Sequence, residues 1–121
     1  MRFTMLLALL ALTAPGCSRT PTARPAPAAV AGKVTRGGQP VGDLVITFQP
    51  LDVGHLGAFP LKPDGTFQGE MIAGEYTYYV AKGATPKSPA ALAKIDAKFQ
   101  EPNLERRVAI APGEPIQIAL D

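Results

Sequence analysis

Cysteine, histidine and tryptophan are almost missing from this chain of 121 residues, which has one Cys, one His and no Trp. A single cysteine excludes a disulfide within the chain. A zinc site needs three or four Cys, His or carboxylate ligands, and the chain offers only one His and one Cys. We therefore expect His55 to be a solvated loop residue rather than a metal ligand or general base, and we predict no metal and no cofactor.

Serine is scarce as well, since Ser18 and Ser88 are the only two. Neither lies in the G-x-S-x-G setting of a nucleophile elbow. Paired carboxylates for glycoside chemistry would have to lie about 5–9 Å apart, and no such pair stands out. The candidate carboxylates for such a pair are Asp43, Asp52, Asp64, Glu70 and Glu75. The sequence therefore predicts a protein that is not an enzyme.

Charge is low and balanced, with 12 Lys and Arg against 10 Asp and Glu. Nucleic-acid binding requires clustered basic residues, and the only basic pair, Arg106-Arg107, follows Glu105. We expect this pair to lie on a solvated strand face and predict no nucleic-acid partner. Four lysines lie between residues 82 and 98, where we expect either a solvated face or a contact with anionic lipid. These are Lys82, Lys87, Lys94 and Lys98.

The N-terminal segment has the layout of an export signal. Arg2 is followed by an apolar run from Met5 to Leu12 and by the small residues of 14–16, the order of a signal peptide. Because Cys17 follows at once, the segment resembles a bacterial lipoprotein signal whose Cys is lipidated. The alternative is a free thiol behind an ordinary leader. An apolar run of about 10 residues is too short to span a bilayer.

Three regions follow from this interpretation. Residues 1–16 are a signal peptide, and residues 17–28 form a tether rich in Pro and Ala, which favours extended chain over helix. Residues 29–121 form one domain. We expect the protein to be exported and held through lipid on Cys17 at the bacterial cell envelope, on the periplasmic face or the cell surface.

The domain shows the two-residue period of β-strands, broken by turn residues. Gly pairs and Pro-Asp-Gly supply the turns, and residues 51–58 read as a glycine-interrupted loop. The predicted strands are 30–35, 44–49, 59–61, 66–71, 75–82, 106–110 and 116–120. Seven short strands at this spacing predict an all-β fold, a Greek-key β-sandwich.

One segment departs from the strand pattern and predicts a helical crossover near 89–98. Ser88-Pro89 would cap a short helix over 90–98, with Pro in its first position. Leu92, Ile95 and Phe99 would then share one face of that helix. The segment is too short for a second domain.

The order of turns and strands resembles a carboxypeptidase regulatory-like domain, as found in small lipoproteins of planctomycete type. The resemblance rests on six stretches and covers 29–121. They are Gly32 to Thr35 with Gly38 to Val41 and Ile46 to Phe48, then Pro63 to Phe67, Ile72 to Thr77 and Ala97 to Pro102. It implies a transthyretin-like sandwich and a non-enzymatic accessory or surface module.

Function is therefore expected from location and surface. We predict a lipid-anchored, non-catalytic binding or structural module whose partner is an envelope protein or a glycan. The alternative is a carbohydrate-binding accessory domain that uses the loops at one end of the sandwich. Tyr79 is the aromatic residue expected to face outward, while Tyr76 and Tyr78 face inward. A lone outward Tyr more often packs across strands than binds sugar.

Overall fold

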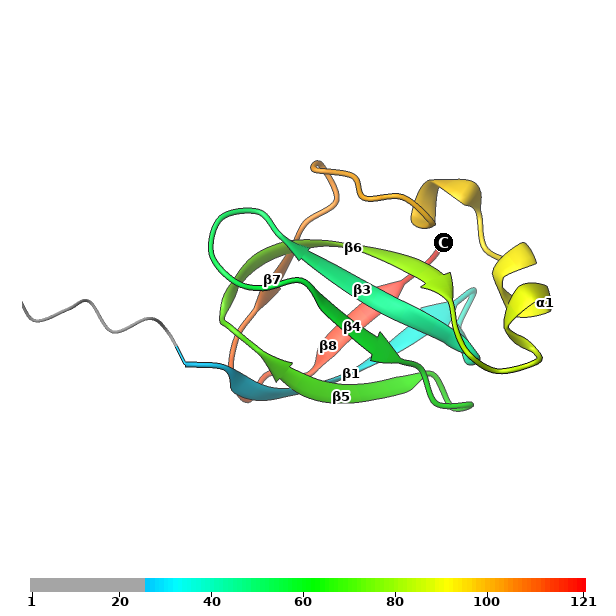
Figure 1. Cartoon of the computed structure of the whole chain (residues 1–121), viewed down its shortest axis with the longest axis horizontal. Helices are drawn as coiled ribbons and strands as arrows, with labels where there is room; N and C mark the ends of the chain where they lie inside the picture. Colours follow the sequence, from blue (N-terminus) through cyan, green and yellow to red (C-terminus); the bar gives the residue numbers. More distant parts are fainter. Residues whose placement is uncertain (1–25) are drawn as a thin grey trace, which may run out of the picture.

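A computed structural model describes residues 26–121 of the chain. The predicted signal peptide, Cys17 and nearly all of the tether lie outside the described residues. Two β-sheets face each other, and their inward side chains form the core (Figure 1). This confirms the predicted all-β class. Among the described residues no helix is long and apolar enough to cross a membrane.

The first sheet is built around β1. Its strands are β1 (Ala28–Arg36), β2 (Gln39–Pro40), β5 (Thr66–Met71) and β8 (Ile116–Ala119). β5 runs antiparallel to β1, with Ala28 opposite Met71, whereas β8 runs parallel to it, with Gly32 opposite Ile116. The first and last strands of the domain are therefore neighbours.

The second sheet has the order β4-β3-β6-β7. Its strands are β3 (Leu44–Pro50), β4 (Gly57–Pro60), β6 (Gly74–Lys82) and β7 (Val108–Ile110). β3 and β6 pair along their whole length, from Leu44 opposite Lys82 to Pro50 opposite Tyr76. β7 pairs with β6 only between Gly74 and Tyr76, so the predicted strand over 106–110 is shorter than expected.

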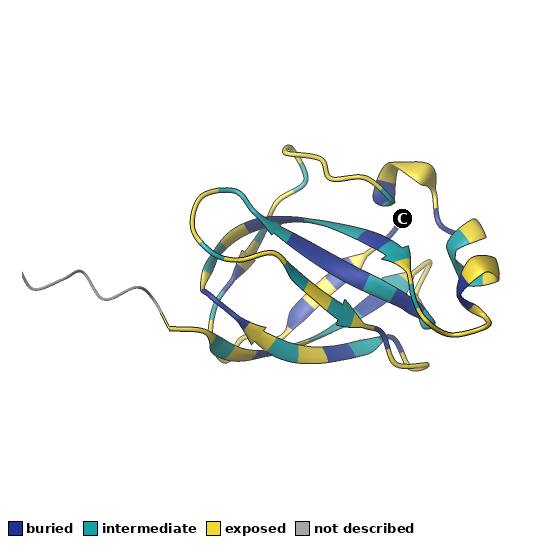
Figure 2. Ribbon diagram, in the orientation of Figure 1, coloured by how far each residue is buried: buried dark blue, intermediate teal, exposed yellow. Residues whose placement is uncertain are grey.

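Aromatic rings fill the space between the sheets. The ring of Phe48 lies 5.7 Å from that of Phe67, 6.1 Å from Phe59 and 6.5 Å, edge-on, from Tyr76. Phe48 and Tyr76 are fully buried, and each such side chain contributes roughly 1.5–3 kcal/mol by leaving water. The dark segments of β3 and β6 in Figure 2 mark this buried layer.

The crossover contains two short helical turns rather than one helix. α1 spans Ser88–Ala93 and the 3₁₀ turn η1 spans Ala97–Phe99, so the helix predicted over 90–98 is wrong in extent. α1 ends at Ala93, with Lys94 as its C-cap, and Asp96 starts η1 because its side chain accepts the Lys98 N–H. Pro89 does lie in the first turn.

The residues of the crossover that were predicted to share one face do pack toward the core, although the helix is interrupted. Ile95 and Phe99 are buried, and Leu92 is half-buried against the core. The predicted cap is wrong, however, because Ser88 is the first helical residue and no side chain caps α1.

The two ends of the sandwich differ in what they carry. The described chain begins at one end, and α1 lies at the other (Figure 1). Ala28 pairs with Met71, and a short turn from Met71 leads to β6, where the Glu75 carbonyl accepts the Leu51 N–H at 3.0 Å. We call the end with Ala28 and residues 51–56 the entry end, and the opposite end the α1 end.

Candidate functional site

Two adjoining hollows lie at the α1 end. One, of about 630 Å³, lies between the end of β1, the α1–η1 connection and Asp121. The other, of about 370 Å³, lies between α1 and residues 39–43. Arg36, Lys94 and Ile95 line both. Segments from opposite parts of the chain therefore meet in one concave surface.

Two hydrogen bonds between side chains and the backbone hold the segments around these hollows together. Ser88 is fully buried, and its Oγ accepts the Gly83 N–H at 2.6 Å, which ties the end of β6 to α1. An Asp121 carboxylate oxygen accepts the Gly37 N–H, which ties the last residue to the β1–β2 turn. The hydroxyl of Ser88 is thus an acceptor in a structural contact.

Asp43 has an uncommon backbone in the wall of the smaller hollow. Its φ is +62°, the one positive φ at a non-glycine position in the described range. Aspartate tolerates this conformation better than most residues. Its carboxylate accepts a hydrogen bond from the Thr85 hydroxyl at 3.2 Å, so Asp43 also joins the β3 entry to the crossover.

The lining of the two hollows mixes both signs of charge. Arg36 and Lys94 lie among Asp43, Asp96 and Asp121. Such a lining offers hydrogen-bond donors and acceptors together, which suits a neutral polar or zwitterionic ligand better than a polyanion. Sequence reasoning pointed to loops at one end but did not identify this set, because its members lie far apart in the chain.

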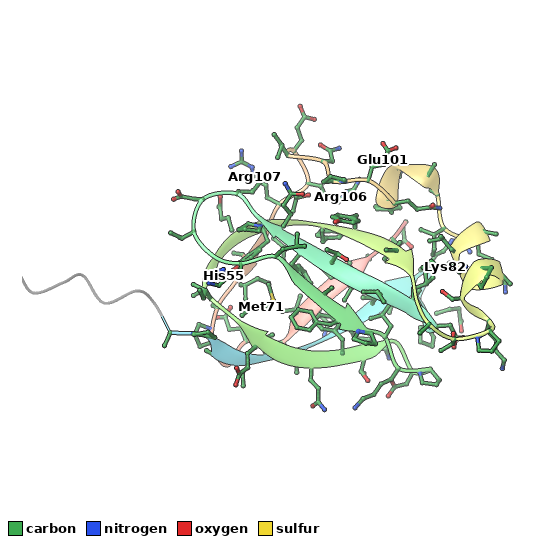
Figure 3. All side chains as sticks on the ribbon, viewed as in Figure 1. His55, Met71, Lys82, Glu101, Arg106 and Arg107 are labelled. Atoms are coloured by element: carbon green, nitrogen blue, oxygen red, sulfur yellow. The ribbon has the colours of Figure 1, made fainter. Side chains whose placement is uncertain are left out.

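The entry end carries the predicted 51–58 loop, which ends at Leu56 because β4 begins at Gly57. His55 is exposed there, above Met71 (Figure 3). Val53 and Leu56 are exposed hydrophobic residues, at 51% and 61%. A third hollow, of about 580 Å³, lies nearby between Ala29, Glu70 and Glu114.

The four crossover lysines do not lie beside the entry end. Lys82 ends β6 next to α1 (Figure 3), and Lys87, Lys94 and Lys98 belong to the α1–η1 segment. All four are exposed. This placement favours the solvated-face interpretation over contact with lipid near an anchor at Cys17.

Arg106 corrects the expectation that the basic pair lies on a solvated strand face. Its guanidinium donates to the carbonyls of Tyr78 and Lys98, at 3.1 and 2.5 Å, and lies 4.7 Å from the Phe99 ring centre. Arg106 is half-buried, whereas Arg107 is exposed and meets Glu75 at 3.5 Å. The alternation of Arg106 with Val108 and Ile110 was the signal for its inward position.

Burial and hydrogen bonding shift the pKa values of two tyrosines and one aspartate. Burial raises the pKa of Tyr76, and burial outweighs the nearby Arg106 charge in raising the pKa of Tyr78. Hydrogen bonds from Thr66 lower the pKa of Asp64, which explains Asp64 as a turn residue. Across residues 26–121 no three His, Cys, Asp or Glu side chains gather closely enough to hold a metal.

Tyr79 lies on the outer face of β6, opposite Thr47 of β3. It is half-buried, and Thr47 beside it is 5% exposed. The outward direction was predicted, but Tyr79 lies in mid-sheet and does not line the hollows at the α1 end.

Comparison with known proteins yields no family. No family model matches the chain, and no curated protein matches it either. A solved structure, a DUF3823 family protein from Parabacteroides merdae ATCC 43184, is similar with a TM-score of 0.51 and 16% identity. The similarity covers 78% of this chain and 45% of that one, so this chain spans less than half its length. At this identity the likeness concerns the fold alone.

Proposed function

We propose that this chain is an exported lipoprotein whose β-sandwich is a non-catalytic binding or structural module at the bacterial cell envelope. The observation that carries the proposal is the lone cysteine, Cys17, directly behind a basic, then apolar, then small-residue leader. Lipid chains at that position would hold the chain at a bilayer. The described domain begins shortly after, at the entry end.

We further propose that the fold is the seven-stranded Greek key of a transthyretin-like, carboxypeptidase regulatory-like domain. The strand order supports it. β6 returns to pair with β3 after β4 and β5, which is the return that a Greek key requires. The two-residue β2 is then an extension of the β1 hairpin rather than one of the seven strands.

In this arrangement the α1 end is the part of the domain that faces away from the anchoring bilayer, where other envelope components can reach it. An anchor joined to the entry end leaves the two mixed-charge hollows at the far end of the sandwich (Figure 1). An envelope protein or a glycan is the partner class that such a surface would meet. We place the binding role at Arg36, Lys94 and Ile95.

The anchor is tested by Cys17→Ser with Ser18→Ala as the neighbouring control. In a bacterial host that lipidates proteins, we expect fatty-acid labelling and membrane retention in the parent and in the Ser18 variant. Both should be lost in the Cys17 variant. If the Cys17 variant keeps its membrane retention, the proposal is wrong.

Carbohydrate binding is the second candidate, favoured by the mixed polar lining of the hollows. The whole mature chain carrying Cys17→Ser can be screened on a glycan array. Binding that Arg36→Ala or Lys94→Ala removes, and Tyr79→Ala leaves intact, would place the sugar at the α1 end. Binding lost only with Tyr79→Ala would move the sugar to the outer face of β6 instead.

A further inference from the structure

The loop of residues 51–56 exposes two apolar side chains to solvent, although the domain has an apolar core. Val53 is 51% exposed and Leu56 61% exposed. In the described part of the chain, the other large hydrophobic residue this exposed is Leu104, at 63%. Two such residues in one short loop leave apolar surface in water, which burial against a partner would remove.

The loop is fixed to the end of the domain from which the chain leads back to Cys17. Leu51 N–H donates to the Glu75 carbonyl at 3.0 Å, and Ala28 pairs with Met71, a short turn before β6 begins at Gly74. From Cys17 to Ala28, fully extended chain reaches at most about 40 Å. Any bilayer that holds Cys17 is therefore within reach of this end of the domain.

Charge does not explain an attraction of this end to a membrane. Asp52, Glu70 and Glu114 are exposed around it, and acidic residues are not drawn to anionic lipid. An interaction here would have to be apolar, through side chains that enter the boundary between head groups and acyl chains. Exposed Val and Leu side chains on a loop are suited to insertion at this boundary.

We propose that Val53 and Leu56 enter the surface of the bilayer that holds Cys17, so that the 51–56 loop is a second, weaker membrane contact. The contact is with neutral, zwitterionic lipid, and anionic lipid weakens it. It rests on the proposed lipid anchor and adds an orientation, with the entry end against the bilayer and the α1 end directed away from it.

The test uses the absence of tryptophan from the chain. Leu56→Trp, Val53→Trp and Leu104→Trp each give the lipidated protein one tryptophan at an exposed apolar position. Each variant, purified from a lipidating host, is reconstituted into phosphatidylcholine vesicles with or without bromine on the acyl chains. Bromine quenches a tryptophan that reaches the acyl region, and vesicle flotation is measured on the same samples.

We expect quenching several-fold greater at positions 53 and 56 than at position 104, with a blue-shifted emission at the first two only. Equal quenching at all three positions in floating protein overturns the loop contact and leaves the anchor standing. Protein that does not float overturns the anchor instead. Replacing part of the phosphatidylcholine with phosphatidylglycerol should reduce quenching at position 56, and an increase would contradict the apolar account.

Discussion

Tyr76 connects the aromatic core to the turn before β6 through its ring and its hydroxyl. Its ring is fully buried against Phe48, and its hydroxyl donates to the Ile72 carbonyl at 2.6 Å. The hydroxyl is thus a buried donor with its partner in place. Because burial raises its pKa above the ordinary 10.0, the folded state favours the neutral phenol.

Tyr76→Phe should lower the free energy of unfolding by about 1 kcal/mol at neutral pH, the usual net value of one hydrogen bond. A raised pKa in the folded state means stability that is present below pH 10.0 and lost as pH rises above it. The variant should therefore lose less stability than the parent above pH 10.0. Urea unfolding at neutral and alkaline pH measures both effects, with Tyr79→Phe as control; an equal alkaline loss in the Tyr76 variant would contradict the account.

Asp43 allows a separate test of backbone strain, because its φ is +62°. Asp43→Ala and Asp43→Gly both lose the hydrogen bond from Thr85, so the difference between them reports the backbone. We expect the Ala variant to be about 1 kcal/mol less stable than the Gly variant. Thermal and urea unfolding of the pair checks this, and equal stabilities would show that the positive φ is relieved at no cost.

Arg106 acts at the scale of elements, because it joins β6 to η1. It donates to one carbonyl in each and lies over Phe99. Arg106→Ala should cost about 2 kcal/mol, since one charge-assisted hydrogen bond contributes roughly 1.5–3 kcal/mol and only the bond to Tyr78 is partly buried, the bond to Lys98 being exposed. Arg107→Ala is the matched control, because its ion pair with Glu75 is exposed, and such pairs contribute at most about 1 kcal/mol. Similar losses in both variants, measured by urea unfolding, would show that Arg106 has no special role.

The strands of the domain could be predicted from the sequence better than its helical segments. Alternation predicted most of the strands because the inward positions of β3 and β6 are regularly apolar, as at Ile46 and Val80. The predicted helix is too long because α1 already ends at Ala93, and Asp96 starts a separate 3₁₀ turn with a local hydrogen bond that periodicity does not detect. The two-residue β2 offered no pattern of its own.

The candidate site was harder to predict than the strands, for a physical reason. Arg36 and Lys94 come together only because β1 and the crossover both end at the α1 end. Such a contact between distant segments has no local signal. The position of the 51–56 loop likewise depends on a contact between distant segments, the hydrogen bond from the Leu51 N–H to Glu75 of β6. The proposed anchor at Cys17, by contrast, rests on its sequence neighbours alone.

The whole molecule depends on a single layer between its two sheets. Phe67 of the first sheet is 2% exposed and lies 5.7 Å from Phe48 of the second. Phe67→Ala should cost about 3–5 kcal/mol, a large part of the 5–15 kcal/mol typical of a small domain. Phe59→Ala, at a half-buried ring, should cost less.

Circular dichroism during thermal unfolding checks this prediction. One cooperative transition at a lower temperature is expected for the Phe67 variant, because both sheets lose the same layer. Two separate transitions would mean that the sheets are stable independently. A larger loss for Phe59→Ala than for Phe67→Ala would place the centre of the core elsewhere.

The parallel pairing of β8 with β1 has a consequence for how the chain folds. Gly32 pairs with Ile116 and Thr35 with Ala119, so the central strand of the first sheet needs a partner strand about 80 residues further along the chain. Contacts between such distant segments slow folding, because the intervening loop must close first. The domain therefore stays incomplete until β8 has joined β1.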